Sequence, residues 1–286
     1  MAIPCLNGVD ILMLTSLASS RPMRVHVLSL AALLLAATAC VDTLPVPNGR
    51  FGTITAGAYD NGGGSWVMRP EAAFYDKTDL SYVPAVGDTC VITTYSPIQT
   101  VNAGLLTLNA GEFLFTSIGG RADTMIPQPG IGLRVYTAIR PLGIPFTPGD
   151  TLTVTVPGSP TGFPASAISI RTAAAFTHAA VGVPAENVNL PLTWTAAPSA
   201  GSQMTFSLRY ASSVSGGALN EQVFCSFTDD GAATINANYL DGWRTALNNN
   251  RSTRALRVRS REVLVDGRTR LSLISSYGQP LLTVNF

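Results

Sequence analysis

The sequence predicts an all-β fold, with two antiparallel β-sandwich domains in tandem, one short helix and an N-terminal signal helix. Apolar and polar residues alternate along most of the 286-residue chain, which is typical of strands with one buried and one solvent-exposed face. Clusters of Gly, Pro, Asn and Asp separate these runs, as in antiparallel sheets joined by short turns. A helical spacing of apolar residues follows in one segment after the signal.

The N-terminal segment 25–39 reads VHVLSLAALLLAATA and carries no formal charge. A helix of this length spans about 22 Å, which is short of the roughly 30 Å hydrocarbon core of a bilayer. Arg21 and Arg24 precede it and supply a positive flank. The segment is therefore typical of a secretory signal, and residues 1–39 are assigned to it, with Met23 as an alternative start.

Small residues and a cysteine follow the apolar run, in the order Ala37-Thr38-Ala39-Cys40. This pattern resembles the lipobox of bacterial lipoproteins, although Ala37 stands where Leu is commoner. The resemblance implies that Cys40 takes a diacylglycerol and that the signal is cut before it. Val41, rather than Asp, then permits delivery to the outer membrane. The alternative is an ordinary signal peptide cut after Ala39, with Cys40 as a free thiol.

Two domains are expected after a tether at residues 40–50: a first β-sandwich over 51–172 and a second over 173–286. The run TLTVTV at 151–156 alternates strictly. The connector 172–189 is long for a hairpin, so the division is placed there. Alternation predicts further strands at 51–59, 66–75, 89–95, 112–118, 133–140, 165–171, 190–195, 204–210, 222–228, 255–265 and 268–275.

The one helical segment of the mature chain is predicted at residues 237–247. Asn236 precedes it and is a good N-cap residue. Leu240, Trp243 and Leu247 follow at spacings of three and four, which places them on one face of a helix. We expect this short helix to cross the end of a sandwich.

The C-terminal hundred residues combine Trp194 on one strand, Cys225 on another and a tight Asp-Asp-Gly turn at 229–231. This layout resembles the immunoglobulin and fibronectin type III sandwiches, although a second cysteine is missing from this half. The resemblance implies an Ig-like fold for the second domain and no particular activity.

The composition excludes several classes of function. Eighteen basic and seventeen acidic residues leave a net charge of +1, which argues against a nucleic-acid partner. The two histidines are His26 in the signal and His178 in the connector, so a histidine-rich metal site is excluded. Catalytic and nucleotide-binding motifs are missing as well. We therefore expect no cofactor and no metal.

Two cysteines, Cys90 and Cys225, remain after the signal and Cys40 are set aside. Both lie in alternating runs on the apolar parity, which predicts burial. In an oxidising compartment they could form a disulfide that joins the two halves. They could equally be two separate buried thiols, and the predicted domain division favours this second alternative.

Arginines gather near the C-terminus, where Arg257, Arg259 and Arg261 follow one another at every second position. Since strand side chains repeat every two residues, one strand face should carry all three guanidinium groups. They could dock an anionic partner, or they could be a solvated face that prevents edge-to-edge aggregation. Val263 and Val265 share this parity, so a β-bulge near Glu262 is expected to switch the faces.

Taken together, the sequence predicts a lipid-anchored protein of the bacterial cell envelope, exported to the periplasm and the outer membrane, with a binding or structural role. Its partners would be the membrane, through the lipid, and an anionic envelope polymer or protein. Two alternatives remain: an enzyme acting on a glycan or polymer through a carboxylate site, and an open β-barrel that carries lipid. A pair of acidic residues in a pocket would favour the enzyme, and an aromatic platform without such a pair would favour glycan binding.

Overall fold

The structure is a computed structural model that describes residues 49–60, 65–76, 87–95, 107–128, 134–140, 143–212, 218–247, 250–280 and 283–284. The chain divides into two compact units, Met1–Pro45 and Val46–Phe286, and the described residues all belong to the second. The predicted signal segment, Cys40 and nearly all of the tether lie outside them. Among the described residues, no helix has the length and hydropathy needed to cross a membrane.

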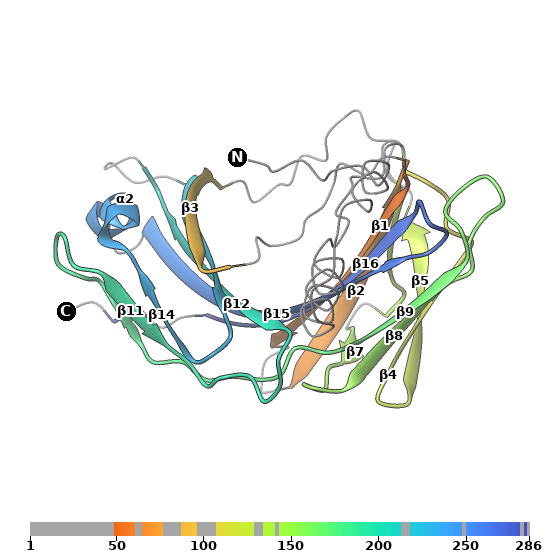
Figure 1. The fold of residues 1–286 in the computed structure, drawn as a ribbon, viewed down its shortest axis with the longest axis horizontal. Coiled ribbons are helices and arrows are strands. Elements are labelled where there is room, and N and C mark those ends of the chain that lie inside the picture. The colour runs from red at the N-terminus through yellow and green to blue at the C-terminus, as the bar shows by residue number, and fades with distance from the viewer. Residues whose placement is uncertain are drawn as a thin grey trace, which may run out of the picture. The chain divides into compact units, whose positions relative to one another are not determined.

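The described residues form an all-β fold dominated by antiparallel pairing, which confirms the predicted fold class (Figure 1). The strands are β1 (Phe51–Asp60), β2 (Trp66–Tyr75), β3 (Thr89–Thr94), β4 (Leu114–Ile118), β5 (Arg121–Gln128), β6 (Val135–Ala138), β7 (Ile144–Pro145), β8 (Thr151–Val156), β9 (Ser166–Arg171), β10 (Val181–Gly182), β11 (Leu190–Thr193), β12 (Ser202–Tyr210), β13 (Glu221–Thr228), β14 (Ala232–Ile235), β15 (Arg251–Leu264), β16 (Arg270–Pro280) and β17 (Thr283–Val284).

Thirteen of these strands form one sheet in the described part of the chain, in the order β3-β13-β12-β15-β16-β1-β2-β6-β5-β4-β8-β9, with β7 beside β2. Two further pairs, β10 with β17 and β11 with β14, lie apart from it. The β1–β16 and β10–β17 pairs are parallel, and the others are antiparallel.

The main sheet crosses the boundary that was predicted between two sandwiches at residues 172 and 173. Strand β1 pairs along its length with β16, so that Phe51 lies opposite Arg270. Strand β3 likewise pairs with β13, so that Cys90 lies opposite Cys225. Because strands from both expected domains pair with one another within one sheet, the two-sandwich arrangement is corrected to a single compact unit. The length of the connector suggested a domain boundary, but the residues on both sides of it belong to one compact unit.

One half of the sheet curls back on itself. Its last strand, β9, lies against β15 and β16 in the middle of the strand order, yet these strands share no ladder with β9. A seam therefore remains between β9 and β15, with backbone groups of the β9 edge facing it. This seam positions the candidate site described below.

The alternation of apolar and polar residues explains which side of each strand is buried. In β8, Leu152, Val154 and Val156 are buried, whereas Thr151 and Thr155, on the opposite parity, are exposed. One continuous apolar cluster of the described residues fills the inside, and its largest members include Trp243, Tyr136, Phe74, Phe163 and Phe206. Burial of such aromatic side chains is the main stabilising contribution to a fold of this kind.

The predicted helix is shorter than expected and is broken into two turns. A 3₁₀ turn, η2 (Ala237–Tyr239), precedes α2 (Asp241–Thr245). Asn236 caps the first turn as predicted, since its side chain accepts a hydrogen bond from the Asn238 backbone N–H at 3.3 Å. Trp243 is fully buried, but Leu247 lies beyond the helix and is half exposed.

Candidate functional site

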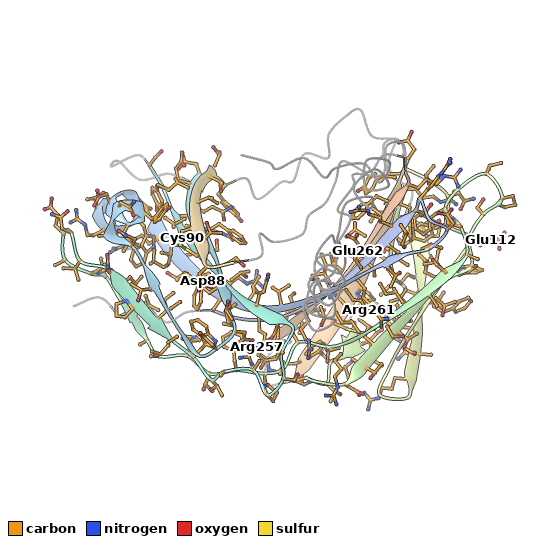
Figure 2. All side chains as sticks on the ribbon, in the orientation of Figure 1. Asp88, Cys90, Glu112, Arg257, Arg261 and Glu262 are labelled. Atoms are coloured by element: carbon orange, nitrogen blue, oxygen red, sulfur yellow. A yellow bond between two sulfur atoms is a disulfide. The ribbon has the colours of Figure 1, made fainter. Side chains whose placement is uncertain are left out.

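The arginine ladder of β15 lies on the core-facing side of the strand, because Arg257, Arg259 and Arg261 have the same parity as the buried residues Thr253 and Ala255. The β15–β16 register runs without interruption from Arg254–Pro280 to Leu264–Arg270. The β-bulge predicted near Glu262 is therefore wrong. The ladder instead leaves the core gradually, from a buried Arg257 to an exposed Arg261 (Figure 2).

Arg257 is fully buried and forms an ion pair with Asp229, whose side chain is also buried. Its Nε donates to Asp229 Oδ2 at 2.7 Å and its Nη2 to Asp229 Oδ1 at 2.9 Å, which makes a bidentate pair. The same carboxylate accepts hydrogen bonds from Trp194 Nε1 at 2.8 Å and Ser202 Oγ at 2.6 Å. Both oxygens of Asp229 are thus fully satisfied inside the protein.

The remaining donors of Arg257 bond to backbone carbonyls on both sides of β11. Its Nη1 donates to the carbonyl of Ala175 at 2.8 Å, and its Nη2 donates to the carbonyl of Thr195. The guanidinium carbon lies 5.3 Å from the ring centre of Phe176. Arg257 is therefore a structural residue, and its assignment to a docking surface is corrected: a buried and fully paired guanidinium cannot contact a partner.

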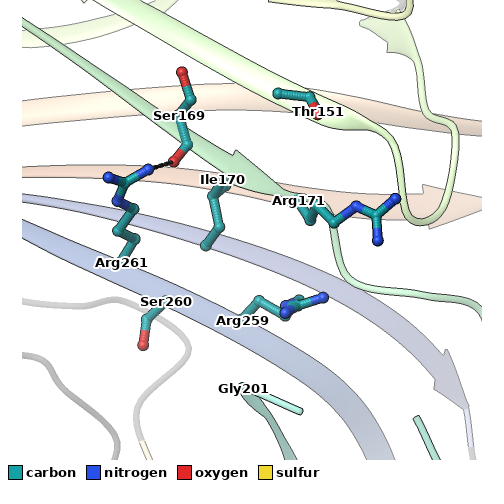
Figure 3. Close-up of a pocket in the computed structure, with 8 residues that line it drawn as sticks. All are labelled: Thr151, Ser169, Ile170, Arg171, Gly201, Arg259, Ser260 and Arg261. Atoms are coloured by element: carbon teal, nitrogen blue, oxygen red, sulfur yellow. Dashed lines mark hydrogen bonds between the residues drawn. The ribbon is translucent and has the colours of Figure 1, made fainter. Parts of the chain in front are cut away.

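Arg259 and Arg261 reach the surface at the seam. Arg259 donates to Ser199 Oγ at 3.2 Å and to the carbonyl of Ala200 at 2.8 Å. Arg261 donates to the carbonyl of Ser169 at 2.8 Å, a backbone group of the β9 edge (Figure 3). Since a guanidinium carries five N–H donors, these bonds orient both groups and leave other donors available.

A groove of about 420 Å³ lies along this seam and brings a third arginine, Arg171, beside the other two. Arg171 is the last residue of β9 and is exposed. The complete lining, drawn in Figure 3, is Thr151, Ser169, Ile170, Arg171, Gly201, Arg259, Ser260 and Arg261. Arg171 could not be placed at this site from the sequence, because 88 positions separate it from Arg259 and only the curl of the sheet brings the strands together.

The groove carries positive charge without a compensating acid. None of its eight lining residues is acidic. Within the described part of the chain, the salt bridges join Arg140 to Asp123, Arg244 to Asp241, Arg257 to Asp229 and Arg270 to Glu262, and Arg171, Arg259 and Arg261 take part in none of them. Three guanidinium groups around one groove are suited to phosphate, sulfate or carboxylate groups.

A second groove of about 400 Å³ lies at the start of β4 and has an apolar character. Phe113 and Phe115 line it with 45% and 50% of their surfaces exposed, which is unusual for aromatic side chains in this fold. Pro157 and Pro160 face them, and Glu112 is its one acidic residue. A third, smaller groove shares Gly201 and Ser260 with the first and has no acidic lining. None of these three grooves holds a pair of carboxylates.

Cys90 and Cys225 form a disulfide, with their Cα atoms 4.1 Å apart. They lie directly opposite each other on β3 and β13. The two-thiol alternative, which the predicted domain division favoured, is wrong because these strands are neighbours in one sheet. The bond attaches the outermost strand β3 to the rest of the sheet.

The side chains that could bind a metal ion do not form a cluster in the described structure. No three His, Cys, Asp or Glu side chains gather there in an arrangement that could hold a metal ion. His178 forms an isolated bridge with Trp194, and its Nδ1 lies 2.9 Å from the carbonyl of Ala179. The groove at the seam is therefore the candidate site.

No protein-family model matches the chain, and no curated protein matches it either. Among solved structures, the chain is similar to a Ca²⁺-stabilized adhesin with which an Antarctic bacterium binds ice. The two are 8% identical, with a TM-score of 0.20, and the similarity covers 85% of this chain and 67% of the adhesin chain. A likeness of this level does not indicate a shared function.

Proposed function

We propose that this protein is a lipid-anchored component of the bacterial cell envelope, on the outer membrane, that binds the anionic groups of an envelope polymer in the seam groove. The observation that carries the proposal is the gathering of Arg171, Arg259 and Arg261 around a groove that has no acidic lining residue. A binding role suits this geometry, because guanidinium groups recognise anions and do not themselves transfer protons at neutral pH.

The hydrogen bonds of the seam favour binding by holding the cations in place before an anion arrives. Arg259 is oriented by the carbonyl of Ala200, and Arg261 by the carbonyl of Ser169. A ligand therefore meets guanidinium groups whose conformational entropy is already reduced, which lowers the cost of association.

Attachment through Cys40 belongs to the same proposal and is supported by the lipobox-like sequence before it. Several acyl chains, at about 0.8 kcal/mol for each buried methylene, make a stable anchor. In cells that process lipoproteins, Cys40→Ser should move the protein from the membrane fraction to the soluble fraction. A Cys40→Ser protein that stays with membranes after an alkaline carbonate wash would contradict this part of the proposal.

Binding is tested with the purified full chain in detergent and with polyphosphate, a polyanion of uniform charge. The triple variant Arg171→Gln, Arg259→Gln and Arg261→Gln should lose affinity by about a hundredfold, because several charge-assisted hydrogen bonds are removed. The unaltered protein should bind more weakly as salt increases. The control is Arg268→Gln, an exposed arginine in the turn after β15. Equal affinities of the triple variant and the control would reject the groove as the binding site.

A further inference from the structure

Strands β4, β8 and β9 share an outer face with a regular pattern. Each of them buries every second residue and exposes those between, as the patterns BeBeB in β4, eBiBeB in β8 and ieBiBe in β9 record. The three strands are direct neighbours in the sheet, in this order. Their outward side chains therefore form a continuous surface.

The pairing register gives the arrangement of side chains on this face. Phe115 lies opposite Thr155, and Thr155 opposite Ala167. One step along the strands, Ser117 lies opposite Thr153, and Thr153 opposite Ser169. The Thr153 and Ser169 hydroxyls are hydrogen-bonded to each other at 2.8 Å. A further step places Thr151 opposite Arg171. The face thus consists mainly of small hydroxyl side chains.

This hydroxyl strip, formed by Thr151, Thr153, Thr155, Ser117 and Ser169, connects the two grooves. At one end, Thr151 and Ser169 also line the arginine groove. At the other end, Phe115 lines the apolar groove with Phe113. With strands about 4.8 Å apart and a rise of about 3.4 Å per residue, the Cα atoms of Phe115 and Arg171 are about 17 Å apart.

We propose that the polymer bound by this protein is an anionic polysaccharide that lies across this face, with acidic groups in the arginine groove and a sugar ring on Phe113 and Phe115. This inference rests on the proposed function and names the class of its ligand. The distance between the grooves requires an extended ligand, since a single phosphate or sulfate ion would occupy the arginine groove alone.

The chemistry of the three parts matches that of a charged sugar polymer. The apolar faces of sugar rings pack on aromatic side chains, and Phe113 and Phe115 are exposed and adjacent on one side of the chain. Serine and threonine hydroxyls can both donate and accept hydrogen bonds, as sugar hydroxyls do. Glu112 beside the phenylalanines can accept from a sugar hydroxyl, and it disfavours an acidic group at this end.

Charge complementarity favours this ligand over a polyanion of uniform charge. The arginines lie at one end of the face, and the strip and the apolar groove add no positive side chain among their lining residues. A nucleic acid or a polyphosphate laid along the face would place charges beside Glu112 and over neutral hydroxyls. A polysaccharide with acidic and neutral parts leaves no charge unpaired.

The test compares three polymers on the full chain in detergent, by titration at fixed salt. They are dextran sulfate of low substitution, in which most sugar rings carry no sulfate, polyphosphate, and uncharged dextran. Three proteins are used besides the unaltered one. The first is the triple arginine variant, and the second carries Phe113→Ser and Phe115→Ser. The control is Ile92→Ser on β3, which removes a side chain of 51% exposure, close to that of Phe115, in the other half of the sheet.

We expect the phenylalanine variant to bind dextran sulfate about tenfold more weakly, because two aromatic contacts are lost. Its affinity for polyphosphate should be unchanged, and the Ile92→Ser control should resemble the unaltered protein with both ligands. The triple arginine variant should lose its affinity for both dextran sulfate and polyphosphate. Uncharged dextran should bind far more weakly than dextran sulfate.

The other outcomes separate the two proposals. If the arginine variant loses its affinity for both polyanions and the phenylalanine variant keeps its affinity for both, the groove binds anions but the polysaccharide inference is wrong. The inference is also wrong if the phenylalanine substitutions reduce the affinity for polyphosphate as much as the affinity for dextran sulfate. If the arginine variant binds both polyanions normally, the proposed function itself is rejected.

Discussion

Arg257 and Arg261 lie four residues apart on the same side of β15, but they have opposite surroundings. Arg257 is fully buried against Asp229, whereas Arg261 is exposed and bonded to the edge of β9. The strand itself is regular between them, since its register with β16 is continuous. What differs is the covering layer: the connector 172–178 closes over Arg257, and the seam leaves Arg261 in contact with solvent.

The comparison shows that one strand face can combine a structural and a binding role. A buried pair such as Arg257–Asp229 is not strongly stabilising in itself, because both charges lose their hydration. Its bonds to Trp194, Ser202 and the carbonyl of Ala175 do, however, specify how the connector, β12 and β15 fit together. Arg259 and Arg261 contribute little to this arrangement, so their guanidinium groups can bind a ligand.

The largest effect is expected when this contrast is tested by removing one charge of the buried pair. Arg257→Gln should lower the free energy of unfolding by about 3 to 5 kcal/mol, because Asp229 is then left buried without its counter-charge. Arg261→Gln, four residues away, should cost about 1 kcal/mol or less. Urea unfolding followed by tryptophan fluorescence measures both. If the two variants lose similar stability, the contrast between the two ends of the ladder is wrong.

The disulfide provides the next largest effect and tests how strongly the edge strand β3 is held to its neighbour β13. Cys90 and Cys225 close a loop with a sequence separation of 135, so the bond restricts the unfolded chain strongly. Replacing both by Ala should cost about 2 to 4 kcal/mol. A reductant should destabilise the unaltered protein and leave the double variant unchanged in thermal unfolding. A reductant effect on the double variant would show that this bond is not the relevant one.

Substitutions at the seam should reduce the stability of the fold much less than those at the buried pair or the disulfide. The seam is therefore a suitable place for a binding site. The triple variant Arg171→Gln, Arg259→Gln and Arg261→Gln removes three hydrogen bonds to Ser199, Ala200 and Ser169. Since all of these are at least partly exposed, the stability should fall by about 1 to 2 kcal/mol in total, with the large effect on polyanion binding described above. Loss of the folded state in this variant would instead make the exposed arginines structural.

Strand positions follow well from the sequence where alternation is strong. The run TLTVTV became β8 at the predicted residues. Strand β5, Arg121–Gln128, was missed because only Met125 in it is fully buried, so it shows no alternation. The short strand β14 was missed because it consists of four residues after a turn. Strands of this kind are held by their neighbours rather than by their own pattern.

The candidate site could be predicted only in part. The shared face of Arg257, Arg259 and Arg261 follows from the period of a strand, but the burial of Arg257 depends on Asp229, which lies 28 residues earlier in the sequence. Arg171 and Arg259 meet only because the sheet curls back. The Cys90–Cys225 bond depends in the same way on the β3–β13 pairing. Such contacts between distant segments leave no local signal in a single sequence.

The smallest expected effect concerns Asp266, an acid that differs from Asp229 in lying in an exposed turn between β15 and β16. Hydrogen bonds, first of all from the Arg268 backbone N–H at 3.0 Å, lower the pKa of Asp266 below its usual value. The Thr269 hydroxyl donates to the same carboxylate at 3.0 Å.

Because the folded state favours the ionised form of Asp266, the stabilising contribution of this carboxylate is present at neutral pH and is lost as pH falls below about 4. Asp266→Asn should therefore be less stable than the unaltered protein at pH 7, by less than about 1 kcal/mol since the site is exposed, and the difference should narrow towards pH 3. Urea unfolding of both proteins over this pH range measures it, and a difference that grows on acidification would contradict the role of the ionised carboxylate.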